Sequence, residues 1–446
     1  MKNHPLVRQI GALTALATAA ALALSGCSGG TGGDDFGSSA PDHLSGTVSL
    51  WHFFNDREAE AIKGVVEDFQ KENPDVKVKI HAGQDDEKLA KVIASGGDID
   101  VAISASTDSV GLFCSSGSFR DLGDVIKRDS VDMSQLTDVA KSYTSFDGKQ
   151  CAMPMLADVY GLYFNSDLLE AAGITAPPKT LSELTDMAVK LTTYNADGSI
   201  KTLGFNPIIG SYENTPVHYG PAAGAKWMDG DKSAINSPEW KELMTWQKDF
   251  VDQIGYDKLQ AFTAGLGDEW SADNAFQSGQ VAMAMDGEWR VAFLADQKPD
   301  LKYGTAPFPV ADSHADLYGG GYTSGTIAGI AKGSHQPELA WALLKYLTLN
   351  TDAVVKLANG IKNVPTTQDA LASSDLDFPE QFQTFLDVAS SPSLATNPAT
   401  AIGAANQTTF ANYWAKYQSG DGGELDAGLT AVDKDIDNAL ALSKAP

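Results

Sequence analysis

The stretch SLWHFFNDREAEAIKGVVEDFQKENPDVKV, residues 49–78, holds a strand, a helix and a second strand in turn. Its start belongs to the apolar run TVSLWHFF (47–54), which predicts a strand. Four apolar residues then recur at helical spacing and predict an amphipathic helix: Ile62, Val65, Val66 and Phe69. Pro74 ends this helix, and VKVKI (76–80) alternates apolar residues with lysines, as a strand with one wet face does.

The same alternation of strand and helix continues along the chain. DEKLAKVIASGG (86–97) predicts a helix with a glycine stop, and IDVAISAS (99–106) predicts a third strand. This βαβαβ order predicts a parallel sheet covered by helices, in which ligands bind beyond the carboxyl ends of the strands. Three segments rich in hydrogen-bonding side chains follow those ends: His52–Asp56, Gln84–Asp86 and Ser104–Asp108.

Longer helices dominate from about residue 158 onward. Three helix starts are marked by a capping box or by a proline in the first turn: Thr180 with Glu183, Ser237-Pro238 and Gln336-Pro337. Trp240 and Trp341 fall on the apolar faces of the second and third of these helices and are expected in the core. The part after Pro379 is helical in pattern. At 446 residues the chain is too long for one hydrophobic core, so we expect two lobes.

The N-terminus carries the pattern of an export signal. Lys2 and Arg8 precede the uncharged, Ala- and Leu-rich run at 10–24, which is too short to span a bilayer comfortably. Leu24-Ser25-Gly26-Cys27 resembles the bacterial lipobox, which implies a signal peptide at 1–26 and lipidation of Cys27. An ordinary cleavage site with an incidental cysteine is the alternative. The Gly- and Ser-rich residues after Cys27 predict a flexible tether over 27–45.

Charge and cysteine content limit the partners. The formal charge is −26, and cleavage before Cys27 removes Lys2 and Arg8 and no acids, which takes it to −28. Phosphate backbones would repel so acidic a protein, so we expect no nucleic-acid partner. Because exported proteins meet an oxidising compartment, a disulfide between Cys114 and Cys151 is favoured over two separate buried thiols. No histidine pair has metal-site spacing, and we expect neither metal nor cofactor.

Several stretches in this order resemble the extracellular carbohydrate-binding proteins of ATP-binding-cassette importers, the group of solute-binding proteins that includes the maltose-binding protein. Besides the lipobox and residues 49–78, they are GGDIDVAIS (96–104), MPMLADVYGLYFNSDLLEAAGI (153–174), FQSGQVAMAMDGEWR (276–290), GGGYTSGTIAGIAKGSHQPELAWALLKYLT (319–348) and GIKNVPT (360–366). The resemblance implies an α/β fold of the periplasmic-binding-protein type II class, with two lobes, hinge crossovers and a helical C-terminal region. It implies lobe 1 at 46–157 with 321–363, and lobe 2 at 158–320 with 364–446.

The resemblance also implies a function. A monomeric receptor, held outside the cell membrane by its lipid anchor only, would capture a sugar between the lobes and deliver it to the transmembrane permease subunits of an importer. No Walker A motif is present, so another subunit must hydrolyse ATP.

Trp289 holds the position where the family places a tryptophan against a sugar ring, and we expect its face to cover the C–H face of a pyranose. Asp158 occupies the position of a family acid near the crossover. The family's aromatic residue in the loop after the third strand is absent here, and Trp51 is the expected substitute. The remaining candidates for carbohydrate contact are Asn55, Asp56, Ser104, Ser106, Tyr212, Trp227, Glu288, Arg290 and Tyr322.

Several candidates have a purely structural alternative, and for Trp289 it is that the ring merely caps the core of its lobe. Asn55 and Asp56 could cap a helix, Tyr212 and Trp227 could be surface or core residues, and Glu288 and Arg290 could form a solvated rim. Two other functions stay open as well. The same fold could bind a glycerol phosphate ester, a polyamine or a metal, or a pair among Asp158, Asp286 and Glu288 could serve a secreted glycoside hydrolase.

Overall fold

The structure is a computed structural model that describes residues 35–443. The predicted signal peptide, Cys27 and the first part of the predicted tether lie outside the described residues. Among the residues described, no helix combines the length and apolar character needed to cross a bilayer.

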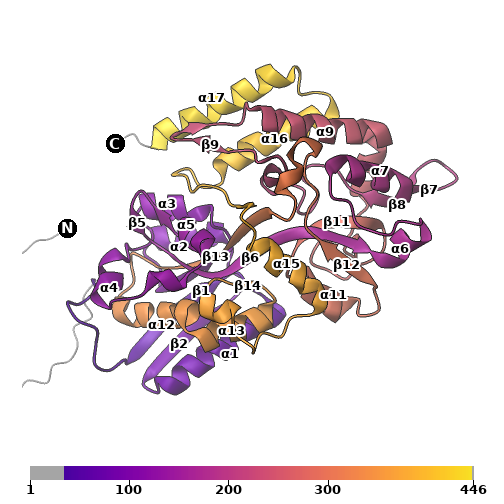
Figure 1. The fold of residues 1–446 in the computed structure, drawn as a ribbon. Coiled ribbons are helices and arrows are strands. Elements are labelled where there is room, and N and C mark those ends of the chain that lie inside the picture. Colours follow the sequence, from indigo (N-terminus) through magenta and orange to yellow (C-terminus); the bar gives the residue numbers. More distant parts are fainter. Residues whose placement is uncertain (1–34, 444–446) are drawn as a thin grey trace, which may run out of the picture. The chain divides into compact units, whose positions relative to one another are not determined.

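The N-terminal βαβαβ unit is present as predicted (Figure 1). It consists of β1 (Gly46–His52), α1 (Asp56–Glu72), β2 (Val76–His81), α2 (Asp86–Ala94) and β3 (Val101–Ser104). Strand β1 pairs in parallel with both β2 and β3. The predicted apolar stripe of α1 is its buried face, which joins this helix to the first hydrophobic core.

Two long antiparallel strands extend the sheet from this unit into the rest of the protein. β13 (Gly321–Ile330) pairs with β3 on one side and with β6 (Met153–Asn165) on the other. Strand β6 continues past β13 and pairs with β11 (Val281–Gly287), which in turn pairs in parallel with β8 (Ile200–Phe205). The strand order is therefore β2-β1-β3-β13-β6-β11-β8-β7, in which β7 is the short strand Thr193–Tyr194. Figure 1 shows β6 and β13 running side by side between the two groups of helices.

Each end of this sheet has its own large hydrophobic core. One core packs α1 against α12 (Pro337–Leu349) and α13 (Thr351–Ile361) over the first strands. The other packs α9 (Pro238–Ile254) and α16 (Ala405–Ser419) beside β8 and β11. Trp240 and Trp341 are buried in these cores as expected, because each lies on the apolar face of its helix.

The helix starts also follow the sequence. Thr180 and Glu183 form a capping box at α7 (Leu181–Leu191), and the side chain of Ser237 caps α9, which opens with Pro238. The remaining elements are α3 (Ser109–Ser115), α4 (Gly123–Arg128), α5 (Asp138–Ser142), β4 (Ser145–Phe146), β5 (Lys149–Gln150), α6 (Ser166–Ala171), β7 (Thr193–Tyr194), α8 (Pro216–Tyr219), β9 (Met228–Asp229), β10 (Lys232–Ser233), α10 (Tyr256–Thr263), α11 (Arg290–Gln297), β12 (Tyr303–Ala306), β14 (Val364–Pro365), α14 (Gln368–Leu371), α15 (Gln383–Ala389), β15 (Leu394–Ala395) and α17 (Leu425–Ser443).

Residues 35–45, the described part of the predicted tether, contact the folded protein and do not form a free linker. Phe36 and Leu44 pack against the first core. The amide of Gly37 donates to Oε1 of Glu338 across 2.7 Å, and its carbonyl accepts from Nη1 of Arg128 across 2.9 Å. Arg128 also holds Glu338 with both arms of its guanidinium, so the chain here binds a fixed pair of charges. Glycine and serine content alone gives no sign of this docking.

The two cysteines of the described chain are joined. Cys114 in α3 and Cys151 before β6 form a disulfide, with Cα atoms 5.6 Å apart. The bond ties α3 to the start of β6, which crosses to the other half of the sheet.

Candidate functional site

A pocket of about 370 Å³ lies where the loop after β3, strands β6 and β13, the segment 213–218 and helix α16 come together. Its lining combines carboxyls, hydroxyls, an amide and aromatic rings: Ala105, Ser106, Asp108, Asp158, Tyr160, Glu213, Thr215, Pro216, Val217, His218, Tyr322, Ser324, Gln407, Thr408 and Ala411. A larger hollow of about 700 Å³ lies beside the disulfide, away from these strands. We take the smaller pocket as the site because it lies at the carboxyl end of β3, between residues of both halves of the sheet.

The strands aim their side chains into the pocket by their period of two. Asp158 and Tyr160 are two residues apart on β6 and therefore share a face, as do Tyr322 and Ser324 on β13. Asp158 is paired directly with Ser324 in the antiparallel register. These four residues thus form one wall of the pocket.

Three aromatic rings meet at this wall. The ring of Tyr160 stacks on that of His218 with centroids 3.9 Å apart. The ring of Tyr322 lies 5.1 Å from that of His218 and 5.5 Å from that of Tyr160. Together they give the pocket an apolar surface next to its polar groups.

His218 is held in one tautomer. Its Nδ1 lies 2.5 Å from the main-chain carbonyl oxygen of Glu213, which only accepts, so Nδ1 carries the hydrogen and donates it. Burial lowers the pKa of His218 to about 4, and the carbonyl contact opposes this only in part. The ring is therefore neutral near pH 7, with Nε2 as an acceptor.

Burial also shifts the pKa values of the acidic side chains in the pocket. It raises the pKa of Asp158 to about 7, with a further rise from the charge of Glu58 and an opposing hydrogen bond from Asn363. Burial raises the pKa of Asp108, against hydrogen bonds from Gln407, Ser106 and Asn397. It raises that of Glu213 as well, with the charges of Glu269 and Asp286 adding to it.

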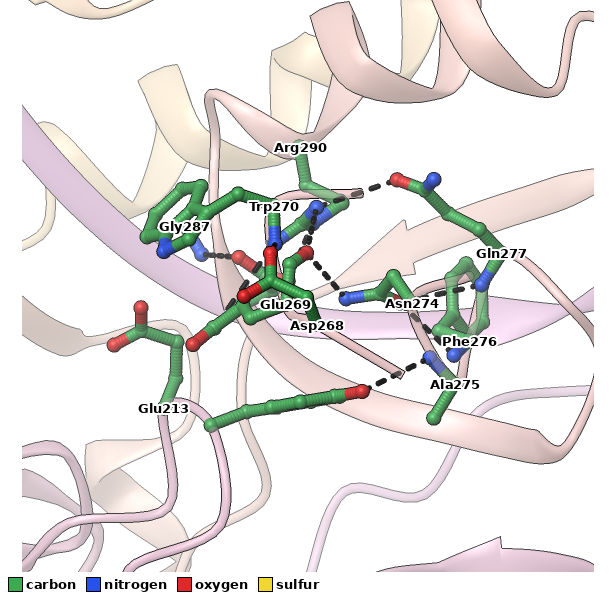
Figure 2. A network of polar contacts seen from close by, with 12 residues as sticks. Glu213, Asp268, Glu269, Trp270, Asn274, Ala275, Phe276, Gln277, Gly287 and Arg290 are labelled. Atoms are coloured by element: carbon green, nitrogen blue, oxygen red, sulfur yellow. Dashed lines mark hydrogen bonds and ion pairs between the residues drawn. The ribbon is translucent and has the colours of Figure 1, made fainter. Parts of the chain in front are cut away.

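A buried polar network lies behind Glu213 (Figure 2). Arg290 donates from Nε to Oδ2 of Asp286 across 2.6 Å, and from Nη1 to the carbonyl of Glu269 across 3.0 Å and to Oε1 of Gln277 across 3.2 Å. These bonds fix the loop before β11 against the first turn of α11.

Three carboxyls of this network lie close enough to share a cation. Ligand atoms of Glu213, Glu269 and Asp286 all lie within 4.8 Å of one another. However, the guanidinium of Arg290 is already bound to Asp286 and lies 4.0 Å from Oε1 of Glu269. A second cation would be repelled by it, so we assign no metal to this cluster.

Three of the residues expected from the sequence meet in the pocket: Ser106, Asp158 and Tyr322. Ser104 is not among the lining residues, and its hydroxyl donates to Oδ2 of Asp86 across 2.8 Å. Asn55 occupies the N-cap position of α1, yet its side chain makes no cap bond. Asp56 follows it with a φ of 44°, in the left-handed region.

Two of the expected aromatic contacts have partners within the protein. Trp51 stacks on His81, with centroids 4.6 Å apart, and its Nε1 donates to the carbonyl of Asp98. Trp227 is buried against Trp240 and Phe410 in the second core. Neither ring lines the pocket.

Tyr212 likewise has its own contacts in the protein. It has a φ of 48°, and its hydroxyl donates to the carbonyl of Gly267 across 2.7 Å and accepts from the amide of Ala275. The ring therefore braces the loop before β11, outside the pocket lining.

Trp289 differs from the expectation of a ring facing an open cleft. Its side chain is only 8% exposed, and it folds over Gly287, whose missing Cβ leaves room for it. Its ring meets Tyr160 edge to face at 5.3 Å. Its Nε1 is buried and has no partner among the described residues. Trp289 therefore supports Tyr160, which lines the pocket, and its own contact with a sugar stays a prediction.

Neither Glu288 nor Arg290 is among the residues that line the pocket, so the carbohydrate contact expected of them stays a prediction. The alternative of a solvated rim is wrong, because both side chains are 0% exposed. Glu288 accepts from the amide of Val159 and from Nδ2 of Asn363, which also donates to Asp158. The buried guanidinium of Arg290 needs the carboxylate of Asp286 as a partner, because a buried charge is tolerated only when it is paired.

Several lining residues were missed from the sequence, above all Tyr160, His218, Asp108 and Glu213. The period of two along β6 could have indicated Tyr160, two positions after Asp158. Asp108 falls within the polar segment after the third strand. Glu213 and His218 lie in an irregular segment without periodicity, and no local signal points to them.

Comparisons with known proteins agree with this architecture. Over 334 residues the chain is 23% identical to the maltotriose-binding protein of Pyrococcus abyssi, covering 74% of this chain and 69% of that protein. It is 28% identical over 306 residues to the maltodextrin-binding protein MdxE of Bacillus subtilis, covering 66% and 67%. The structure of CpMnBP1 with mannotriose bound superposes with a TM-score of 0.77 at 25% identity, covering 87% of this chain and 99% of that one.

These neighbours share the two-lobed α/β fold of periplasmic binding proteins. The family model described as bacterial extracellular solute-binding protein matches residues 64–384, well over half of the chain. The chain therefore belongs to the bacterial extracellular solute-binding proteins.

Proposed function

We propose that this protein is a lipid-anchored receptor that captures a sugar or oligosaccharide in the pocket and delivers it to the permease subunits of an ATP-binding-cassette importer. The observation that carries the proposal is the pairing of the Tyr160, His218 and Tyr322 rings with hydrogen-bonding side chains in one pocket. A pyranose has C–H faces for such rings and hydroxyls for such polar groups. As a solute-binding protein the chain is not an enzyme, which removes the glycoside hydrolase alternative.

The relatives support a sugar as the solute, since those named above bind maltotriose, maltodextrin or mannotriose by their names. The lining supports it against a phosphate ester, because no lysine or arginine is among the described residues that form the pocket. A phosphate ester would call for such side chains.

The proposed lobes are 46–157 with 321–363 and 158–320 with 364–446, which close on the ligand. Ligand can shift the balance between open and closed forms only by binding one of them better. The lipid anchor rests on Leu24-Ser25-Gly26-Cys27. Replacing Cys27 by alanine is expected to move the protein from the membrane fraction to the medium, whereas a protein that stays with membranes would contradict the anchor.

Calorimetric titration with maltotriose, maltodextrins and mannotriose tests the sugar. Micromolar binding, about −8 kcal/mol, is the expected strength. Tyr322→Ala should weaken it on the order of tenfold or more, as removal of a buried aromatic contact does. Asp435→Asn on the exposed face of α17 serves as the control. Absence of heat and of any thermal shift across these oligosaccharides and a wider glycan panel would refute a sugar ligand.

A further inference from the structure

The pocket has acids and no basic side chain to balance them. Asp108, Asp158 and Glu213 line it, whereas no lysine or arginine does so within the part of the chain that the structure describes. Arg290 lies behind Glu213, but its guanidinium is directed to Asp286, Glu269 and Gln277. The pocket therefore gathers three carboxyl groups without a basic side chain, and burial raises the pKa of each of them.

The partners of these acids are neutral donors or other acids. Asp158 accepts from the amide of Asn363, and Asp108 accepts from the hydroxyl of Ser106 across 3.2 Å. Glu213 has the carboxyl of Glu269 as its neighbour. Carboxylates in a recessed site are costly unless a cation or several donors compensate them.

The lining of the pocket also includes a second kind of acceptor, the imidazole of His218. His218 lines the pocket, is 8% exposed, and donates from Nδ1 to the carbonyl of Glu213, so Nε2 presents a lone pair. Among residues 35–443 no hydrogen bond to Nε2 is found. An occupant with N–H or O–H donors would satisfy it.

The aromatic rings agree with a positive charge. Tyr160 and Tyr322 flank His218 in the wall of the pocket, and the faces of such rings attract ammonium groups as well as C–H faces of sugars. A neutral sugar would use the rings but would bring no positive charge, whereas a bound ammonium group would favour the ionised form of the three acids.

We propose that the pocket selects a carbohydrate that carries a protonated amine, that is, an amino sugar or an oligosaccharide containing one. This inference rests on the proposed sugar-binding function and narrows it. An ammonium group supplies one positive charge and three N–H donors, which the acids and Nε2 of His218 accept. The hydroxyls of Ser106, Thr215, Ser324 and Thr408 take the hydroxyls of the same ligand.

A bare metal ion fits this pocket less well than an amine. The three acids and His218 do not gather their ligand atoms within reach of one ion, since the only such group among the described residues is Glu213, Glu269 and Asp286. A polyamine shares the cationic chemistry and has no use for the hydroxyl-rich lining, so it is one arm of the test.

The test is calorimetry on the full chain in detergent with sets matched in stereochemistry. Each set pairs an amine with its neutral counterparts: glucosamine, galactosamine and mannosamine with the plain and N-acetylated sugars, and the β-1,4-linked glucosamine trimer with cellotriose and the N-acetylglucosamine trimer. In at least one set the amine is expected to bind about tenfold tighter than both neutral members, as a desolvated charge pair allows.

The outcomes separate the two proposals. Neutral members that bind as tightly as the amines in every set, or maltotriose and mannotriose binding while no amine binds, would overturn the amine and leave the sugar receptor intact. Spermidine binding in the absence of any sugar binding would overturn both.

Two variants test whether the acids of the pocket cause the preference for an amine over a neutral sugar. Asp108→Asn and Glu213→Gln each keep the shape and remove a charge, and each should reduce the preference for amine over neutral sugar by about tenfold while the thermal midpoint stays within a few degrees. Asp435→Asn removes the same charge from an exposed position on α17 and should leave the preference unchanged. If both pocket variants fold and keep the full preference, the pocket acids do not recognise the amine and the inference fails.

Discussion

The guanidinium of Arg290 donates from Nε to Oδ2 of Asp286 across 2.6 Å, where both side chains are almost wholly buried. The pair is four residues apart and joins the end of β11 to the start of α11. Because Arg290 also holds the carbonyl of Glu269, the pair fixes the loop behind the pocket.

Replacing Arg290 by methionine leaves the carboxyl of Asp286 buried without its partner. The free energy of unfolding should fall by about 3–5 kcal/mol, the usual cost of breaking a buried pair on one side. Denaturant titration measures this. The double variant Arg290→Met with Asp286→Leu should recover a large part of the loss, because it removes both charges. A single variant that loses less than about 1 kcal/mol would mean that the pair is not held as described.

Reduction of the disulfide provides a second test of stability. Cys114 and Cys151 are 37 residues apart in sequence, and a loop of that length restricts the unfolded chain by up to about 4 kcal/mol. The double variant Cys114→Ser with Cys151→Ser should therefore unfold at lower denaturant concentration, and a reductant should then have no further effect. An equal midpoint for both proteins would show that the bond contributes nothing to stability.

The side-chain amide of Asn363 donates one hydrogen bond to Asp158 and one to Glu288. We expect these two buried acids to make the stability of the protein depend on pH. Burial raises the pKa of Asp158 to about 7 and that of Glu288 well above its usual range, and the charge of Glu58 on α1 raises that of Asp158 further. The folded protein therefore keeps protons that the unfolded chain releases near pH 4. Their contribution to stability is complete below about pH 4 and is lost as the pH rises through about 7.

The thermal midpoint should accordingly be higher at about pH 5 than at about pH 8. In the variant Asp158→Asn, the new amide oxygen still accepts from Asn363 but the side chain does not titrate. The change of the thermal midpoint with pH should therefore be smaller in this variant. A pH profile that is as steep in this variant as in the wild type would assign the effect to other groups.

Local patterns were enough for the first half of the sheet and for the helix starts. The stripe of α1, the alternation in β2 and the caps at Thr180 and Ser237 depend on neighbours within a few residues, so the sequence indicates them directly. The order of the later strands could not be predicted from local patterns, because β3, β13 and β6 pair although they are far apart in sequence.

The site could be predicted only in part for the same reason. Ser106, Asp158 and Tyr322 lie at strand ends or in crossover strands, where family landmarks apply. Glu213 and His218 come from an irregular segment whose path depends on packing against distant elements. The sequence also does not indicate which way a side chain points after a strand ends. Glu288 follows β11, and its carboxyl turns inward to accept from the amide of Val159.

Trp289 was expected to meet the sugar and is found behind Tyr160, so substitutions must separate contact from support. Trp289→Ala opens a large space next to Tyr160 and should lower sugar affinity by about 2 kcal/mol or more, together with the thermal midpoint. Trp289→Phe keeps a ring against Tyr160. If the indole only supports Tyr160, this variant should retain most of the affinity measured by calorimetric titration. If the indole moves to face the sugar in the closed form, Trp289→Phe should lose affinity nearly as far as Trp289→Ala. Unchanged affinity in a folded Trp289→Ala protein would contradict both roles, because neither the pocket wall nor the ligand would then depend on this ring.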